Sequence, residues 1–103
     1  MFNKIKTVMC TINIKEVLDS QNSLPDAGKI LYNTIVDAIA SDDKVVANME
    51  GVSSLPSVFL NVSIGKIIDE YDMETLKSHI MFSKITRHQA GRLKDYLLRY
   101  DQN

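Results

Sequence analysis

The fold class follows from KVVANMEGVSSLPS, residues 44–57, in which an apolar run leads into a glycine and then into a serine-rich segment. Within 44–49 the apolar residues are Val45, Val46, Ala47 and Met49, which is typical of a short strand that is buried on both faces of a parallel sheet. Gly51 marks the turn after it, and Pro56 among the serines matches the first turn of a helix. The stretch therefore predicts a buried strand, a turn and a helix.

The residues before this stretch predict another strand and a long helix. Residues 5–14 are rich in β-branched side chains and partly alternate between apolar and polar, so we expect a strand that buries Cys10 as an inert thiol. Ser23, Pro25 and Asp26 have the spacing of a helix start. The helix after them carries apolar residues at helical spacing, namely Ala27, Leu31, Ile35 and Ala38.

The residues after this stretch predict one helix, a third strand and a last helix. The first of these helices has an apolar face from Leu60 to Tyr71 and should end at the acidic residues between Asp69 and Glu74. Residues 78–82 predict a short strand, and Thr86 and Gln89 match a capping box. The last helix should bury Ala90, Leu93, Leu97 and Tyr100. This β-α-β-α-β-α order predicts a small α/β domain with a mostly parallel sheet.

Length and composition place limits on the class of protein. The chain has 103 residues, of which 45% are hydrophobic and 24% charged, with a formal net charge of −1 and one cysteine. These values fit one domain over residues 1–103 and exclude disordered and collagen-like classes. A single cysteine favours a reducing, cytoplasmic setting, and no apolar run is long enough to span a membrane. Because three strands are few for a sheet, a fourth strand at 14–18 or a homodimer stays open.

No motif in the sequence carries catalytic chemistry. His79 and His88 are the only histidines, and neither stands at the spacing of a metal or triad motif. The four glycines form no phosphate loop, and the acidic residues at 69–74 lack the spacing of a calcium loop. We therefore expect a non-enzymatic protein without cofactor or metal.

The C-terminal part of the chain carries an excess of positive charge. From Lys77 onward, the sequence contains six basic residues and only two acidic ones, Asp95 and Asp101. A solvated helix face is the usual role of such a basic patch, and an acidic protein partner would also fit it. Nucleic acid is disfavoured, because the chain as a whole is not basic. We define the basic patch as Lys84, Arg87, Arg92 and Arg99.

The serines after Gly51 allow two interpretations. Local pattern favours Ser53, Ser54 and Ser57 as caps of the helix that begins there. The alternative is an anion site, because a helix start offers free N–H donors and the positive end of the dipole. A phosphate on Ser57 would be stabilised in the same way.

Residues 45–60, VVANMEGVSSLPSVFL, resemble the signature of STAS domains, above all the small stand-alone STAS-like family of unknown function. The resemblance extends more loosely from the first strand to the last helix. It implies a bacterial regulatory module that binds a protein partner, as the anti-sigma-factor antagonists do. In those antagonists a histidine-kinase-like ATPase phosphorylates a serine that falls on Ser57 here, although Pro56 replaces the aspartate that usually precedes it.

The resemblance also implies a partner-binding surface at the start of this helix, made of Ser53, Ser54, Ser57, Val58 and Asn61. Two other classes of function stay open beside it. One is an anion- or nucleotide-sensing module that uses the same helix start. The other is a nucleic-acid-binding or phage-conflict protein that uses the basic C-terminal helix.

Overall fold

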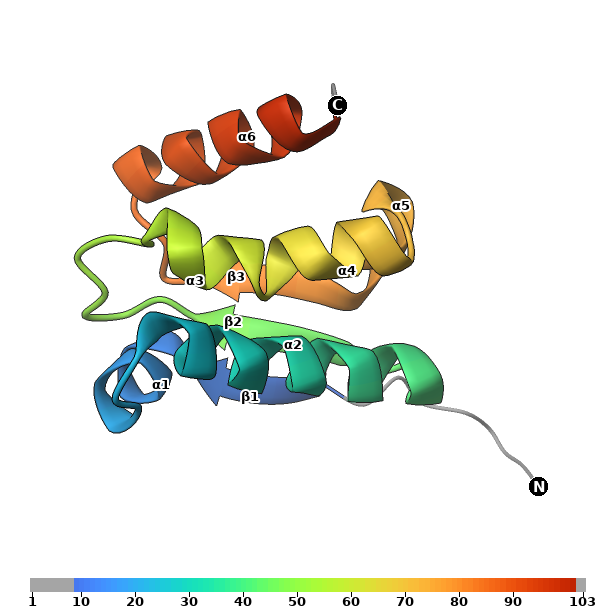
Figure 1. Cartoon of the computed structure of the whole chain (residues 1–103), viewed down its shortest axis with the longest axis horizontal. Coiled ribbons are helices and arrows are strands. Elements are labelled where there is room, and N and C mark those ends of the chain that lie inside the picture. Colours follow the sequence, from blue (N-terminus) through green and yellow to red (C-terminus); the bar gives the residue numbers. More distant parts are fainter. Residues whose placement is uncertain (1–8, 102–103) are drawn as a thin grey trace.

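A computed structural model describes residues 9–101, and it confirms an α/β fold with a three-stranded parallel sheet (Figure 1). The strands β1 (Met9–Asn13), β2 (Lys44–Asn48) and β3 (Ile80–Ser83) pair in the order β1-β2-β3. None of the helices in this part of the chain is long and apolar enough to cross a membrane. The helices are α1 (Ile14–Ser20), α2 (Leu24–Ser41), α3 (Ser57–Asn61), α4 (Ile64–Glu70), α5 (Met73–His79) and α6 (Arg87–Asp101).

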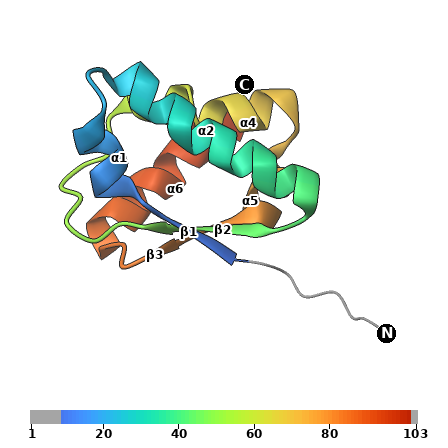
Figure 2. The ribbon, with the colours of Figure 1, turned by 90° about the horizontal axis from the view of Figure 1, so that it is seen from below.

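Figure 2 shows the described helices on one side of the sheet. The strand order explains this arrangement, because successive right-handed crossovers that step in one direction place their helices on the same face. Val45 and Ala47 face the helices and are completely buried, whereas Val46 is only half-buried and Met81 is 44% exposed. The expectation that β2 is buried on both faces is therefore wrong for one face.

The region around β1 differs from the sequence prediction in two respects. Cys10 is exposed, because β1 is an edge strand and not the central one. Residues 14–18 lie in helix α1 and form no fourth strand. The Asn13 side chain begins this helix by accepting a hydrogen bond from the Glu16 backbone N–H at 3.0 Å. The first part of the predicted strand, residues 5–8, lies outside the described residues.

Helix α2 follows the sequence prediction closely. The Ser23 hydroxyl accepts a hydrogen bond from the Asp26 backbone N–H at 3.2 Å, as the helix-start pattern predicts. All four apolar positions of the predicted face are buried, and the helix ends where Asp42 adopts a left-handed conformation at φ 55°. The core of the domain lies between this helix, the sheet and α4. Its most buried members are Ala27, Ile35, Val45, Ala47 and Ile67.

The single helix predicted after Gly51 is divided into α3 and α4. At the division, the completely buried Ser63 hydroxyl donates to the Phe59 carbonyl at 2.7 Å. A serine that bonds to a carbonyl four residues earlier competes with the helical ladder and often bends a helix. The predicted end near Asp69 is confirmed, since α4 ends at Glu70.

The C-terminal third contains one helix that the sequence pattern did not indicate. The Asp72 carboxylate accepts from the Thr75 backbone N–H at 2.7 Å and begins α5, so β3 starts only at Ile80. The capping box of α6 is confirmed by two bonds of 3.1 Å between Thr86 and Gln89. The predicted burial of Ala90 is wrong, because α6 turns Gln89, Leu93 and Tyr96 toward the core, with Leu97 and Tyr100 partly buried.

Candidate functional site

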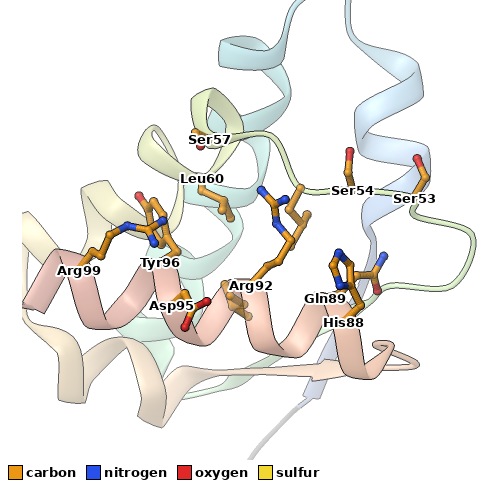
Figure 3. Close-up of a pocket in the computed structure, with 12 residues that line it drawn as sticks. Ser53, Ser54, Ser57, Leu60, His88, Gln89, Arg92, Asp95, Tyr96 and Arg99 are labelled. Carbon is orange, nitrogen blue, oxygen red and sulfur yellow. The ribbon is translucent and has the colours of Figure 1, made fainter.

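A cleft of about 270 Å³ lies between α6 and the loop at residues 49–56, which leads from β2 into α3 (Figure 3). Its wall opposite α6 carries three hydroxyl groups, from Ser53 and Ser54 in the loop and from Ser57 at the start of α3. Its α6 wall carries cationic and polar groups, and Leu55, Leu60 and Leu93 supply apolar surface. The cleft therefore brings two distant parts of the chain together.

The loop is held in place by Gln89, which is only 6% exposed. Its side-chain amide donates a hydrogen bond to the Val52 carbonyl, while its carboxamide oxygen accepts from the Thr86 backbone N–H at 3.1 Å. Gly51 permits the turn that brings Val52 there, because it adopts φ 81°, which side chains rarely tolerate. One side chain thus begins α6 and fixes the opposite wall of the cleft.

The rest of α6 is attached by two tyrosines. The Tyr96 hydroxyl donates to Asn61 Oδ1, and the Tyr100 hydroxyl donates to Asp69 Oδ2, both at 2.7 Å. Gly65 leaves room for these rings, since a Cβ there would lie 2.7 Å from the Tyr96 hydroxyl. Burial raises the pKa of Tyr96, and burial together with the Asp69 hydrogen bond raises the pKa of Tyr100 to about 12. Both hydroxyls therefore stay protonated and donating at neutral pH.

The basic side chains of the cleft come from one face of α6. His88, Arg92 and Arg99 are separated by four and seven residues, which places them on the same face of a helix. Figure 3 shows the Arg92 side chain extending from α6 toward the loop. Among the described side chains, neither arginine has an ion-pair or hydrogen-bond partner, and Asp95 is the one carboxylate that lines the cleft. The site therefore has a surplus of positive charge.

The structure places the predicted partner-binding residues on two neighbouring surfaces. Ser53, Ser54 and Ser57 line the cleft, whereas Val58 and Asn61 lie outside it on α3. All five residues are exposed, with Val58 at 47%. The prediction that these serines cap a helix is wrong. The residue at the cap position of α3 is Pro56, and no side-chain cap bond forms there.

The residues of the basic patch are also divided. Arg92 and Arg99 line the cleft with the serines, while Arg87 is exposed at the first turn of α6 outside it. Lys84 lies in the turn before α6, and its Nζ is 3.3 Å from Glu50 Oε1. The cleft thus brings together the serines after Gly51 and two arginines of α6, which lie far apart in the sequence.

Sequence reasoning missed the role of three cleft residues. His88 lies four residues before Arg92, so a search for basic side chains at helical spacing would have found it. The contacts of Gln89 with Val52 and of Tyr96 with Asn61 join residues 37 and 35 positions apart, and no local pattern indicates them. Chemically, the arrangement supplies hydrogen-bond donors and positive charge to a ligand. The positive charge comes from α6, because the five-residue α3 has a small dipole.

Comparison with known proteins identifies the family. Residues 27–89, more than half of the chain, match the family model of the STAS-like domain of unknown function (DUF4325). The matched segment runs from the first turn of α2 to the capping box of α6 and includes the loop wall of the cleft. No curated protein and no solved structure matches the chain. The chain therefore belongs to the family of STAS-like domains of unknown function.

Proposed function

We propose that this chain is a non-enzymatic regulatory module of the bacterial cytoplasm that binds a protein partner. The binding surface is the face formed by the 49–56 loop, α3 and the cleft side of α6. The observation that carries the proposal is that Ser53, Ser54 and Ser57 are exposed and have no hydrogen bond within the described part of the chain. The fold therefore does not use these side chains, and they are free to contact a partner.

The apolar part of this surface is Val58. Its side chain is 47% exposed on α3, where it lies next to Ser57 in the sequence and three residues before Asn61 on the same short helix. Protein interfaces commonly combine a small apolar centre with a polar rim. Val58 with its α3 neighbours Ser57 and Asn61 has this composition.

Partner switching would act through Ser57. The hydroxyl is exposed at the first residue of α3 and lines a cleft that contains two unpaired arginines. A phosphate added there would bring close to two negative charges to the docking surface and change its complementarity to a partner. By the family resemblance, the proposed modifying partner is a histidine-kinase-like ATPase.

The test is affinity purification of the tagged full-length chain from its native host, with intact-mass measurement of the recovered protein. Val58→Glu should remove a stoichiometric partner that the unmodified chain retains, because it places a charge at the apolar centre. Asn33→Glu is the matched control, since Asn33 is exposed on α2 and adds the same charge elsewhere. A mass gain of one phosphate that maps to Ser57 would support the switch.

Two outcomes would contradict the proposal. One is a stoichiometric partner that remains bound to Val58→Glu and is lost from Asn33→Glu, which would place the interface elsewhere. The other is recovery of the chain without any stoichiometric protein under conditions in which it is expressed and folded.

A further inference from the structure

The cleft gathers more hydrogen-bond donors than the fold itself needs. Arg92 and Arg99 each present a planar group of N–H donors, and the serines on the opposite wall add hydroxyls. Within the described part of the chain, the side chains of these two arginines and of Ser53, Ser54 and Ser57 have no hydrogen-bond or ion-pair partner. Unpaired donors that line one cavity on two walls are the arrangement expected for an oxyanion ligand.

The position of each wall is set by the contacts that hold α6. Gln89 binds the Val52 carbonyl at one end of the cleft, and Tyr96 binds Asn61 at the other. Both side chains are over nine-tenths buried, Gln89 at 6% and Tyr96 at 8% exposure. The distance between the arginines and the serines is therefore determined by packed residues, although the arginine side chains themselves are exposed.

The type of anion follows from charge and shape. The positive charges of the two arginines outweigh the negative charge of Asp95. A carboxylate has two oxygens in one plane, whereas a phosphate monoester has three free oxygens and up to two charges. The latter matches guanidinium groups on one wall and hydroxyls on the other. A volume of about 270 Å³ holds such a group with a small carrier.

We propose that this cleft is a binding site for a phosphate monoester, held between Arg92 and Arg99 on α6 and the serine hydroxyls of the 49–56 loop and α3. The inference deepens the proposed function, on which it rests, by stating the chemistry that the docking face recognises. The phosphate belongs either to a phosphorylated side chain of the partner or to a small metabolite such as a nucleotide.

The test is an NMR titration of the full-length chain at constant ionic strength, at a pH at which phosphate is mainly a dianion. The probes are inorganic phosphate, phosphoserine, adenosine monophosphate and glutamate. The phosphate-bearing probes should cause saturable shifts of the backbone amides within 53–57, Pro56 excepted, and within 88–99. Glutamate should bind at least about tenfold more weakly. Tighter binding of phosphoserine than of adenosine monophosphate would identify a phosphorylated side chain as the source, and the reverse order would identify a small metabolite.

A matched pair of double variants separates the site from general electrostatics. Arg92→Gln with Arg99→Gln should weaken phosphate binding by about tenfold or more. Arg87→Gln with Lys94→Gln removes the same charge from exposed positions of the same helix outside the cleft, and it should keep the affinity within about twofold. Circular dichroism checks that both variants fold.

The inference is overturned if no phosphate-bearing probe gives saturable shifts, if glutamate binds as tightly as phosphoserine, or if the two double variants lose affinity equally. A partner that is still lost from Val58→Glu would then leave the proposed docking function in place. Phosphate binding without any stoichiometric partner in the pull-down would support the phosphate site and contradict the docking function.

Discussion

Helices α2 and α6 lie on the same side of the sheet, yet they are attached to the domain in different ways. Helix α2 buries Ala27, Leu31, Ile35 and Ala38, and its Gly28 lies directly against α3. Helix α6 buries Leu93 and Tyr96, and its other attachments are hydrogen bonds from Gln89, Tyr96 and Tyr100 to the loop, α3 and α4.

The difference explains where the candidate site lies. A helix that packs with a continuous apolar face leaves no space beside it, because protein interiors are close-packed. A helix attached by a few long side chains leaves space on either side. Beside α6 this space is the polar cleft on one side and an apolar groove of about 480 Å³ on the other, lined by Met73, Phe82, Ile85, Leu97 and Leu98. The surfaces available for binding therefore collect around α6.

The largest expected effect is the loss of stability when a buried apolar side chain is removed from α2 rather than from α6. Ile35→Ala should lower the free energy of unfolding by about 2–5 kcal/mol, because Ile35 is completely buried and the change leaves a cavity. Leu97→Ala should lower the free energy of unfolding by less than half as much, because Leu97 is partly exposed beside the groove. Urea unfolding measures both variants, with Ile35→Val as a milder control. Equal losses at both positions would show that α6 packs as tightly as α2.

The next contrast uses a glycine in each helix. A Cβ on Gly28 would lie 2.8 Å from the Phe59 carbonyl oxygen and 2.2 Å from Val62 Cγ2, so Gly28→Ala should destabilise the domain by about 1–3 kcal/mol. A Cβ on Gly91 would meet no atom within 4 Å, so Gly91→Ala should stabilise α6 by up to about 1 kcal/mol through helix propensity. Thermal unfolding of the two variants should shift in opposite directions. A stabilised Gly28→Ala variant would contradict the close contact of α2 with α3.

A smaller effect is expected from the polar attachment of α6. Tyr96→Phe removes the bond to Asn61 and should cost about 0.5–1.5 kcal/mol, because Asn61 is exposed and can bind water instead. Tyr71→Phe, at an exposed ring, should change stability by less than about 0.5 kcal/mol. Chemical denaturation resolves this difference, and indistinguishable variants would argue against the role of Tyr96 in holding α6.

The smallest effect is a pH dependence in the alkaline range. The pKa of Tyr100 rises from 10.0 to about 12 in the folded chain, through burial and the bond to Asp69. The unfolded chain therefore loses this proton first, and the contribution of Tyr100 to stability is present below pH 10 and declines as the pH rises toward about 12. Tyr100→Phe should make the stability curve flatter in that range, as measured by urea unfolding at several pH values. An unchanged slope would contradict the bond to Asp69.

The local elements of the fold could be predicted from the sequence. The cap at Ser23, the buried face of α2, the strand at 44–48 and the capping box of Thr86 and Gln89 each depend on residues within a few positions of one another. Such signals act before the chain folds up, so composition and spacing are sufficient to detect them. The candidate site could be predicted only as two separate parts, the serines after Gly51 and the cations of the last helix.

Features that depend on contacts between distant residues follow only from the packing of the folded chain. The position of β1 at the sheet edge exposes Cys10, and the buried Ser63 hydroxyl accompanies the division of the predicted helix into α3 and α4. The bonds of Gln89 to Val52 and of Tyr96 to Asn61 place Arg92 and Arg99 opposite the serines. Local sequence signals thus specify the helices and strands and the chemical groups they carry. Their assembly into one cleft required the docking of α6, because only packing brings together residues that lie more than thirty positions apart.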